Sequence, residues 1–259
     1  MRTDPFISVR GLGMRYFSVN DSAGMTVLRD ISFDVTQGEF VCIVGPSGGG
    51  KSTLLNLFGG FLSPSEGEIL VNRKPVRGPS AERLFIFQDS SLFPWLTVAE
   101  NISLGARHRT PIEREAIVED YLRRMGLSGF ARAYPRELSG GMRQRVELAR
   151  ALAAGPEVLY MDEPFGALDF ITRMNMRNEI VRVWQVEKKT IFFVTHDLEE
   201  AVQIADRIIV MGSRTQGIQA DIRVTLPRPR DVDSPDYLAT RDRLYRMMGI
   251  SLKVGQPVE

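Results

Sequence analysis

The stretch FVCIVGPSGGGKSTLLNLF, residues 40–58, decides the fold of this chain. Its first five residues are apolar, as in a strand buried on both faces of a sheet. Residues 45–52 then match the pattern G-x-x-x-x-G-K-[ST], and the following STLLNLF is typical of a helix. A strand, a glycine-rich turn and a helix in this order predict a loop that binds phosphate.

The residue types of this loop suit a dense anion. Glycines let successive backbone N–H groups converge on phosphate without obstruction by Cβ atoms, and the helix adds the positive end of its dipole. Lys51 can reach the β and γ phosphates, and the Ser52 hydroxyl can coordinate Mg²⁺. The candidate phosphate-binding residues are Gly45, Pro46, Ser47, Gly48, Gly49, Gly50, Lys51, Ser52 and Thr53.

Strand and helix patterns alternate along the rest of the chain, which predicts an α/β fold. Short apolar runs indicate further strands of a parallel sheet at 84–87, 158–161, 191–194 and 208–211. Turn-rich connections favour a smaller antiparallel sheet built from segments 6–10, 27–35 and 67–72.

Two segments lie outside this pattern. Residues 97–150 are mostly helical, and we expect a helical subdomain inserted between two strands of the parallel sheet. From residue 226 the chain reads LPRPR and then becomes weakly helical at 234–248, with Ser234 followed by proline as the helix start. We expect one main domain over 5–225 and a short extension over 226–259.

Composition narrows the class of protein. The net charge of +1 argues against bulk electrostatic binding to nucleic acid. The longest apolar run is five residues, whereas a membrane-spanning helix needs about 20. The first ten residues lack an apolar segment of signal-peptide length, so we expect no secretory signal. Cys42, the single cysteine, fits a reducing compartment.

A second candidate site lies in VLYMDEP, residues 158–164, where a buried strand ends in two carboxylates. Ligands of α/β sheets bind at such strand ends. Asp162 can hold Mg²⁺, and Glu163 can orient or deprotonate an attacking water. Taken alone, the pair could also be an ordinary acidic loop.

The run LSGGMRQR, residues 138–145, resembles the signature motif of ABC ATPases, and the phosphate loop and MDEP support that resemblance over residues 5–225. It implies ATP with Mg²⁺ and a P-loop core with an antiparallel β subdomain and an inserted helical subdomain. It also implies a dimer with a second copy, in which Ser139, Gly140 and Gly141 bind the ATP of the opposing subunit. Without the family, these residues would be a loop that caps a helix.

Further positions match the family one by one. Gln88 resembles the glutamine that contacts Mg²⁺ or the attacking water, and His196 resembles the switch histidine that contacts the γ-phosphate. Asp169 lies in a segment that resembles the D-loop at the dimer interface. Tyr16 best matches the aromatic residue that stacks on adenine, with Phe17 as the close alternative. Taken alone, a glutamine or a histidine at a strand end is usually structural, Tyr16 could equally be a core aromatic residue, and Asp169 could be a simple helix cap.

The segment FPWLTVAENI, residues 93–102, is most similar to ATPase subunits of the nitrate, sulfonate, taurine and bicarbonate importer group. Its apolar side chains Phe93, Trp95 and Leu96 either fill a small core or receive a helix of a membrane partner. LPRPR also fits that group, or is a solvated basic tail. The resemblance implies an integral membrane permease as partner, indirectly a solute-binding protein, and a place at the cytoplasmic face of the cell membrane.

Rival functions are an exporter subunit and an ABC ATPase acting on ribosomes or DNA. The chain has one ATPase unit and no long coiled-coil insertion, which disfavours the translation and repair types. It also lacks a strong basic stripe, so we expect no nucleic-acid partner. A P-loop kinase or GTPase would leave the signature motif unexplained.

Overall fold

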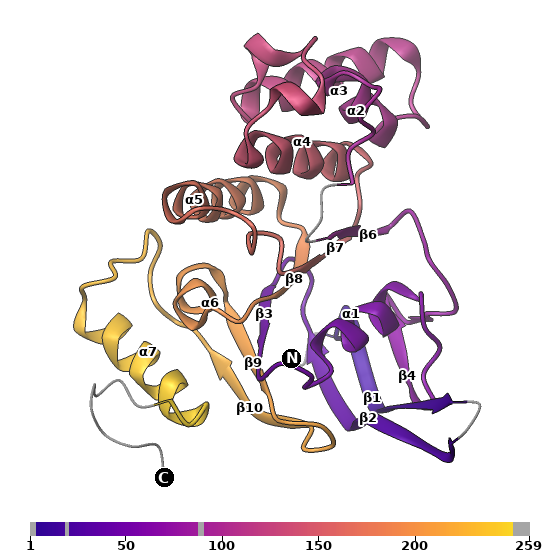
Figure 1. The fold of residues 1–259 in the computed structure, drawn as a ribbon, viewed down its shortest axis with the longest axis vertical. Helices are drawn as coiled ribbons and strands as arrows, with labels where there is room; N and C mark the ends of the chain where they lie inside the picture. The colour runs from indigo at the N-terminus through magenta and orange to yellow at the C-terminus, as the bar shows by residue number, and fades with distance from the viewer. Residues whose placement is uncertain (1–3, 19–20, 88–90, 251–259) are drawn as a thin grey trace. The chain divides into compact units, whose positions relative to one another are not determined.

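The computed structural model describes residues 4–18, 21–87 and 91–250, shown in Figure 1. The chain forms two compact units. The first comprises Met1–Pro79 and Thr190–Glu259, and the second comprises Ser80–Lys189. Over the described residues, no helix combines the length and hydrophobicity that a membrane span requires.

An antiparallel sheet of the first unit is formed by β1 (Ile7–Ser18), β2 (Asp21–Val35), β4 (Glu66–Val71) and β5 (Lys74–Pro75), in the order β2-β1-β4-β5. This confirms the predicted antiparallel sheet. The first two strands run further than the sequence pattern indicates. Their register shifts between Val9 and Leu12 and again before Met14, which interrupts the alternation of buried and exposed residues.

The parallel strands of the first unit carry the phosphate loop. The strand β3 (Phe40–Val44) pairs in parallel with β8 (Thr190–Val194) and with β9 (Arg207–Met211). Every residue of these three strands is buried, as their continuous apolar runs predict. Beside β9 lies the antiparallel strand β10 (Ile218–Arg223), which the sequence analysis missed.

Helix α1 (Lys51–Gly59) joins the two sheets of the first unit. Its Phe58 ring lies 5.9 Å from the ring of Phe33 on β2 and 5.0 Å from that of Phe192 on β8. The helix α6 (Leu198–Ile204) follows β8 and begins at Asp197, whose carboxylate accepts from the backbone N–H of Glu200. A carboxylate at this position satisfies one of the N–H groups that the first turn of a helix leaves without a partner.

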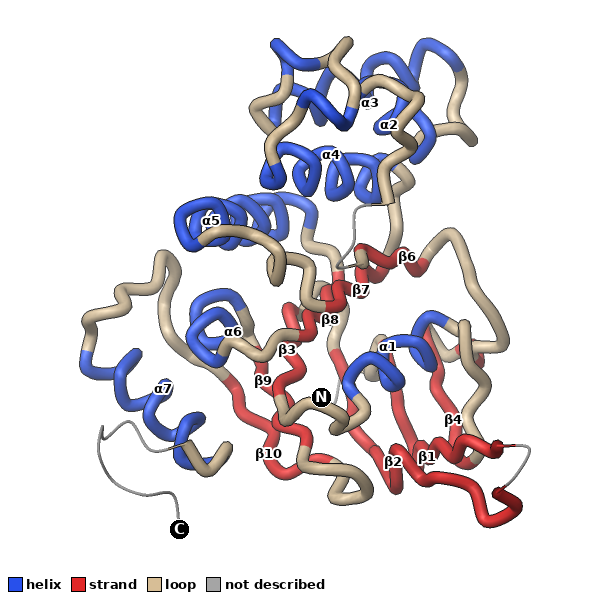
Figure 2. The backbone as a smooth tube through the Cα atoms, in the orientation of Figure 1, coloured by secondary structure: helices blue, strands red, loops and turns tan. Residues whose placement is uncertain are grey.

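The second unit contains the parallel pair β6 (Arg83–Ile86) and β7 (Val158–Asp162). Its helices are coloured blue in Figure 2. They are α2 (Val98–Gly105), α3 (Pro111–Arg124), α4 (Gly140–Ala153) and α5 (Phe170–Glu187), with short 3₁₀ turns at Ser128–Phe130 and Pro135–Glu137. Thr97 and Thr110 each form a capping box with a glutamate three residues later, which fixes where α2 and α3 begin.

The basic LPRPR segment is docked rather than solvated, so the alternative of a free basic tail is wrong. Arg230 donates to the carbonyl oxygens of Val202 and Ala205, and Arg228 donates to that of Ile204 at 2.7 Å. These carbonyls lie at the end of α6, where a helix leaves acceptors unpaired. Burial, and then the neighbouring Arg228, lower the pKa of Arg230 to about 10.

The chain then continues into α7 (Pro235–Met247), which begins at Ser234 as predicted. The hydroxyl of its buried Tyr237 lies 3.4 Å from the carbonyl oxygen of Glu199 on α6. The C-terminal extension is thus tied to α6 at both ends of that helix.

We expect Arg230→Ala to lower the free energy of unfolding by about 1–3 kcal/mol, because it leaves the carbonyls at the end of α6 without their charged donor. Urea unfolding followed by circular dichroism measures this. The exposed Arg223→Ala is the matched control and should stay within about 0.5 kcal/mol of the parent. Equal stability of the two variants would contradict the docking role of Arg230.

Candidate functional site

The phosphate loop of the first unit curls around the ammonium group of Lys51. The Nζ atom donates to the carbonyl oxygens of Gly45 at 2.9 Å and Pro46 at 3.0 Å, and the residue is only 8% exposed. Gly50 precedes α1 with a φ of 91°, a conformation that glycine adopts without strain. The first turn of the helix then carries the exposed Ser52.

The loop is pressed against the end of β9. A Cβ atom at Gly45 would lie 2.6 Å from the carbonyl oxygen of Met211, and one at Gly49 would lie 2.7 Å from that of Gly212. Glycine at position 49 therefore suits this backbone. Residues 211–212, which contact the phosphate loop, cannot be predicted from the motif, because nothing in it points to them.

His196 lies at the same end of the parallel strands as the phosphate loop. It is exposed and follows β8, and β8 is the parallel neighbour of β3, from which the loop emerges. The preceding Thr195 donates from Oγ1 to a carboxylate oxygen of the buried Glu200 at 2.6 Å, and it also accepts the N–H of Asp197. These bonds fix the backbone on both sides of His196.

Two other predicted positions remain untested by geometry. Tyr16 and Phe17 are neighbours near the end of β1, and both are exposed, Phe17 the more so. Gln88 lies outside the described residues. The prediction of an adenine-stacking residue and of a metal-contacting glutamine stays a prediction.

In the second unit, the carboxylate pair follows β7. Asp162 is the last residue of that strand, and Glu163 adopts a φ of 47°, in the left-handed region. Such a backbone costs a non-glycine residue roughly 1 kcal/mol or more and is concentrated at functional sites. Carboxylate and hydroxyl oxygens are the ligand types that Mg²⁺ prefers, so Asp162 and Ser52 have the right chemistry for that ion.

The signature segment and the segment at Asp169 lie together in the second unit. Ser139 caps α4 by accepting the N–H of Met142, and Asp169 caps α5 by accepting that of Thr172 at 3.0 Å. A Cβ at Gly141 would lie 2.5 Å from the Thr172 side chain, so only glycine lets the two helix starts approach so closely. The helix-capping alternative is therefore what the structure shows for both residues.

These caps leave a surface suited to an anion. Both Ser139 and Asp169 are exposed at the N-termini of neighbouring helices, where free N–H groups and dipoles attract negative charge. The hydrogen bonds that Asp169 accepts from Thr172 lower the pKa of its carboxyl group. The Gln144 side chain also donates to the carbonyl of Pro164, which ties α4 to the segment after Glu163.

A comparison with protein families decides the identity of this arrangement. A family model described as ABC transporter matches residues 28–166. The chain belongs to this family. It is therefore an ABC ATPase, an enzyme that binds and hydrolyses ATP as a transporter subunit, as the signature segment predicts.

Two relatives with transport names are similar to this chain over nearly its whole length. An aliphatic sulfonates import ATP-binding protein, SsuB of Bacillus cereus, is 40% identical over 232 residues, covering 90% of this chain and 92% of SsuB. The bicarbonate transport ATP-binding protein CmpD of Synechocystis is 41% identical over 253 residues, covering 93% and 88%. These two names match the importer group that the segment FPWLTVAENI predicts.

Solved structures confirm the α/β P-loop fold. The ATP-binding cassette MJ0796, in a dimeric post-hydrolysis state bound to ADP and Pi, superposes with a TM-score of 0.72 at 29% identity. The match covers 84% of this chain and 98% of that chain.

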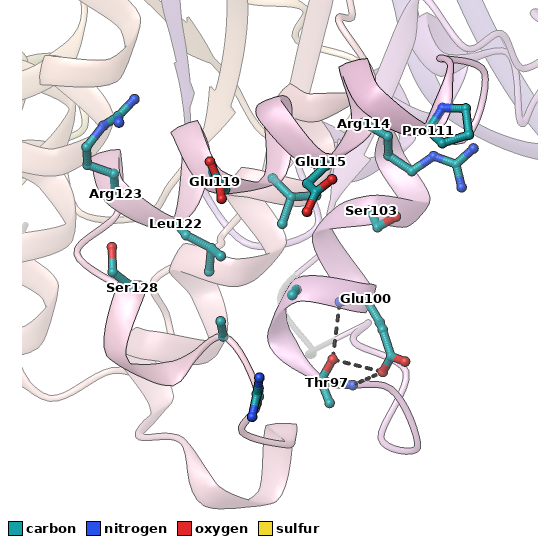
Figure 3. Close-up of a pocket in the computed structure, with 14 residues that line it drawn as sticks. Thr97, Glu100, Ser103, Pro111, Arg114, Glu115, Glu119, Leu122, Arg123 and Ser128 are labelled. Carbon is teal, nitrogen blue, oxygen red and sulfur yellow. Dashed lines mark hydrogen bonds between the residues drawn. The ribbon is translucent and has the colours of Figure 1, made fainter.

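A pocket of about 1000 Å³ opens in the helical part of the second unit (Figure 3). Apolar side chains of Val118 and Leu122 line it together with charged groups, among them Glu100, Arg114 and Arg123. One of its lining residues is Thr97, which lies two residues after Trp95 in the chain.

We expect Lys51→Ala to weaken ATP binding by about 10–100-fold, because charge-assisted hydrogen bonds contribute about 1.5–3 kcal/mol each. Calorimetric titration with ATP measures this. The control is Lys74→Ala, an exposed lysine on β5, which should bind like the parent. Unchanged affinity in the Lys51 variant would refute the role of Lys51 in the phosphate loop.

Proposed function

We propose that this ABC ATPase powers import of a small solute of the nitrate, sulfonate, taurine or bicarbonate type through a separate membrane permease. The direction is supported by SsuB, a relative over most of the chain that is named for import of aliphatic sulfonates, and the solute type also by CmpD, which is named for bicarbonate transport. A solute-binding protein would deliver the solute to the permease. The subunit would act at the cytoplasmic face of the membrane, held there by the permease.

Each predicted site residue has a role in this proposal. Residues 45–53 hold the phosphates, and Tyr16 stacks on adenine. Mg²⁺, which neutralises the phosphates, is held by Ser52, Asp162 and Gln88. Glu163 activates the attacking water, and His196 contacts the γ-phosphate. The oxygen donors of Ser52 and Asp162 and the left-handed backbone of Glu163 are the observations that favour these roles.

The proposed dimer is supported by the exposed N-termini of α4 and α5, at Ser139 and Asp169. We infer that they meet the γ-phosphate and the opposing subunit of a second copy, head to tail. The homologous cassette MJ0796 is dimeric in its state bound to ADP and Pi. Binding of ATP would close this dimer, since each γ-phosphate bridges two chains, and hydrolysis would remove that bridge and open it.

Glu163→Gln should keep ATP binding and form a stable ATP-dependent dimer, because the amide retains the shape of the carboxylate but cannot take the proton of water. Hydrolysis should fall by at least about 100-fold, within the range attributed to general-base catalysis. Phosphate release measures hydrolysis, and size-exclusion chromatography with light scattering measures the dimer.

The control for this variant is Glu157→Gln, before β7, which should hydrolyse ATP like the parent. Turnover like that of the parent in the Glu163 variant would remove Glu163 as the base. A monomer in saturating ATP would contradict the shared-nucleotide dimer instead.

The permease would bind at the aromatic side chains before α2. Phe93 and Trp95 are 40% and 69% exposed, with ring centroids 5.4 Å apart, so they do not fill a core. The adjoining pocket in Figure 3 is lined by both apolar and charged side chains, which suit a short amphipathic helix. Exposed aromatic residues of this kind are typical anchors of protein interfaces.

Trp95→Ala should abolish stimulation of ATP hydrolysis by the permease and weaken co-purification, while hydrolysis by the isolated subunit stays unchanged. The partner to use is a membrane permease identified by its co-purification with this subunit and reconstituted in lipid vesicles. Val186→Ala, an equally exposed apolar residue at the end of α5, is the control. Full stimulation of the Trp95 variant would place the permease contact elsewhere.

A further inference from the structure

The segment that carries the exposed aromatic pair, residues 91–96, is held by buried polar side chains on two helices. We name residues 91–96 the aromatic loop. Asn101 of α2 is fully buried, and its side-chain amide forms hydrogen bonds with this loop. Its Oδ1 accepts the N–H of Phe93 at 2.9 Å, and its Nδ2 donates to the carbonyl oxygens of Phe93 at 3.1 Å and Leu96 at 3.0 Å.

The other side of the loop is bonded to α4. The carboxylate of Glu147 is buried, with the residue only 3% exposed, and it accepts the backbone N–H of Ser91. Arg150, one turn later, donates to the carbonyl oxygen of Ser91 at 3.0 Å and to its hydroxyl. The guanidinium of Arg150 also lies over the Phe93 ring, 5.7 Å from its centroid.

The buried carboxylate of Glu147 is costly, because an ionised group loses its hydration on burial. Its face of α4 also carries Arg150 and Ala151, which lie one turn further along the helix. An apolar residue at 147 would avoid the desolvation of a charge and would commonly be as stable. The charge at 147 therefore points to a positional role, since what it contacts is the start of the aromatic loop.

The same helix begins at Ser139, in the signature segment. Glu147 lies eight residues further on, about 12 Å along a helix that rises 1.5 Å per residue. One rigid element thus carries the signature serine at its exposed end and the contacts to Ser91 in its middle. Any displacement of the signature end reaches the aromatic loop through two side chains rather than through a flexible connection.

We propose that Glu147 and Arg150 are positioning residues that couple the signature helix to the aromatic loop, which Asn101 holds from α2. This inference rests on the proposed function, in which ATP engages Ser139 and the permease engages Trp95. Nucleotide-driven movement of α4 is then transmitted to Trp95, and binding of a partner at Trp95 biases α4 by the same coupling free energy.

Trp95 itself is the reporter for the test. The chain has two tryptophans, and the other, Trp184, is buried on α5. The parent for the experiment is full-length Trp184→Phe with Glu163→Gln, which should hold ATP without turnover. Steady-state anisotropy and emission maximum of Trp95 are recorded without nucleotide and with saturating ATP.

In the parent, we expect high anisotropy and a shift of the Trp95 signal on addition of ATP. Adding Glu147→Ala should lower the anisotropy and abolish the ATP-dependent shift, while ATP binding and dimer formation persist. Glu147→Gln keeps an acceptor oxygen at the same place and should restore most of both signals. Glu68→Ala, an exposed glutamate of β4, is the matched control and should behave like the parent.

Anisotropy and ATP response of Glu147→Ala equal to those of the parent overturn the proposal, and so does a Gln variant as impaired as the Ala variant. If Glu147→Ala does not fold, Arg150→Lys is measured instead, with the same expected losses. Failure of the parent to bind ATP or dimerise counts against the proposed function. The comparison of anisotropy without nucleotide still tests the coupling residues in that case.

Discussion

The phosphate loop works only if the main chain, rather than side chains, faces the anion. This constraint requires the loop to curl tightly, and the curl leaves no room for Cβ atoms at Gly45 and Gly49 against the end of β9. The position of β9 beside β3 is therefore part of the site. Strands buried on both faces hold that neighbour in register, which is why their apolar runs matter for phosphate binding.

The elements that the sequence predicted are those whose pattern is set by burial alone. The strands β3, β8 and β9 are buried on both faces, so each contains a continuous apolar run of four or five residues. The strand β10 alternates Ile218 and Ile222 with polar residues at the sheet edge, and so short an alternation was overlooked. The lengths of the two N-terminal strands were underestimated because their register shifts break the period on which prediction depends.

The candidate site was predicted from local motifs, whereas contacts between distant segments could not be predicted. The phosphate loop, the caps at Ser139 and Asp169 and the strand-end carboxylates are each readable within a few residues. The partners that place them are not: Gly49 meets Gly212, and Gln144 meets Pro164. The LPRPR segment shows the same limit, since nothing in its own sequence says that its arginines bond to α6.

Three charged side chains hold neighbouring segments of the chain in place, although removing a charge from water costs stability. The guanidinium of Arg230, the carboxylate of Glu200 and the carboxylate of Glu147 each satisfy backbone or hydroxyl groups of a neighbouring segment. Apolar packing is non-directional and would let those segments settle in several ways, whereas a hydrogen-bonded charge accepts one arrangement. Glu200 in this way holds the backbone beside His196, Arg230 holds the end of α6, and Glu147 holds the start of the aromatic loop. In the proposed mechanism, these charged groups would act through the position of the segments that they hold.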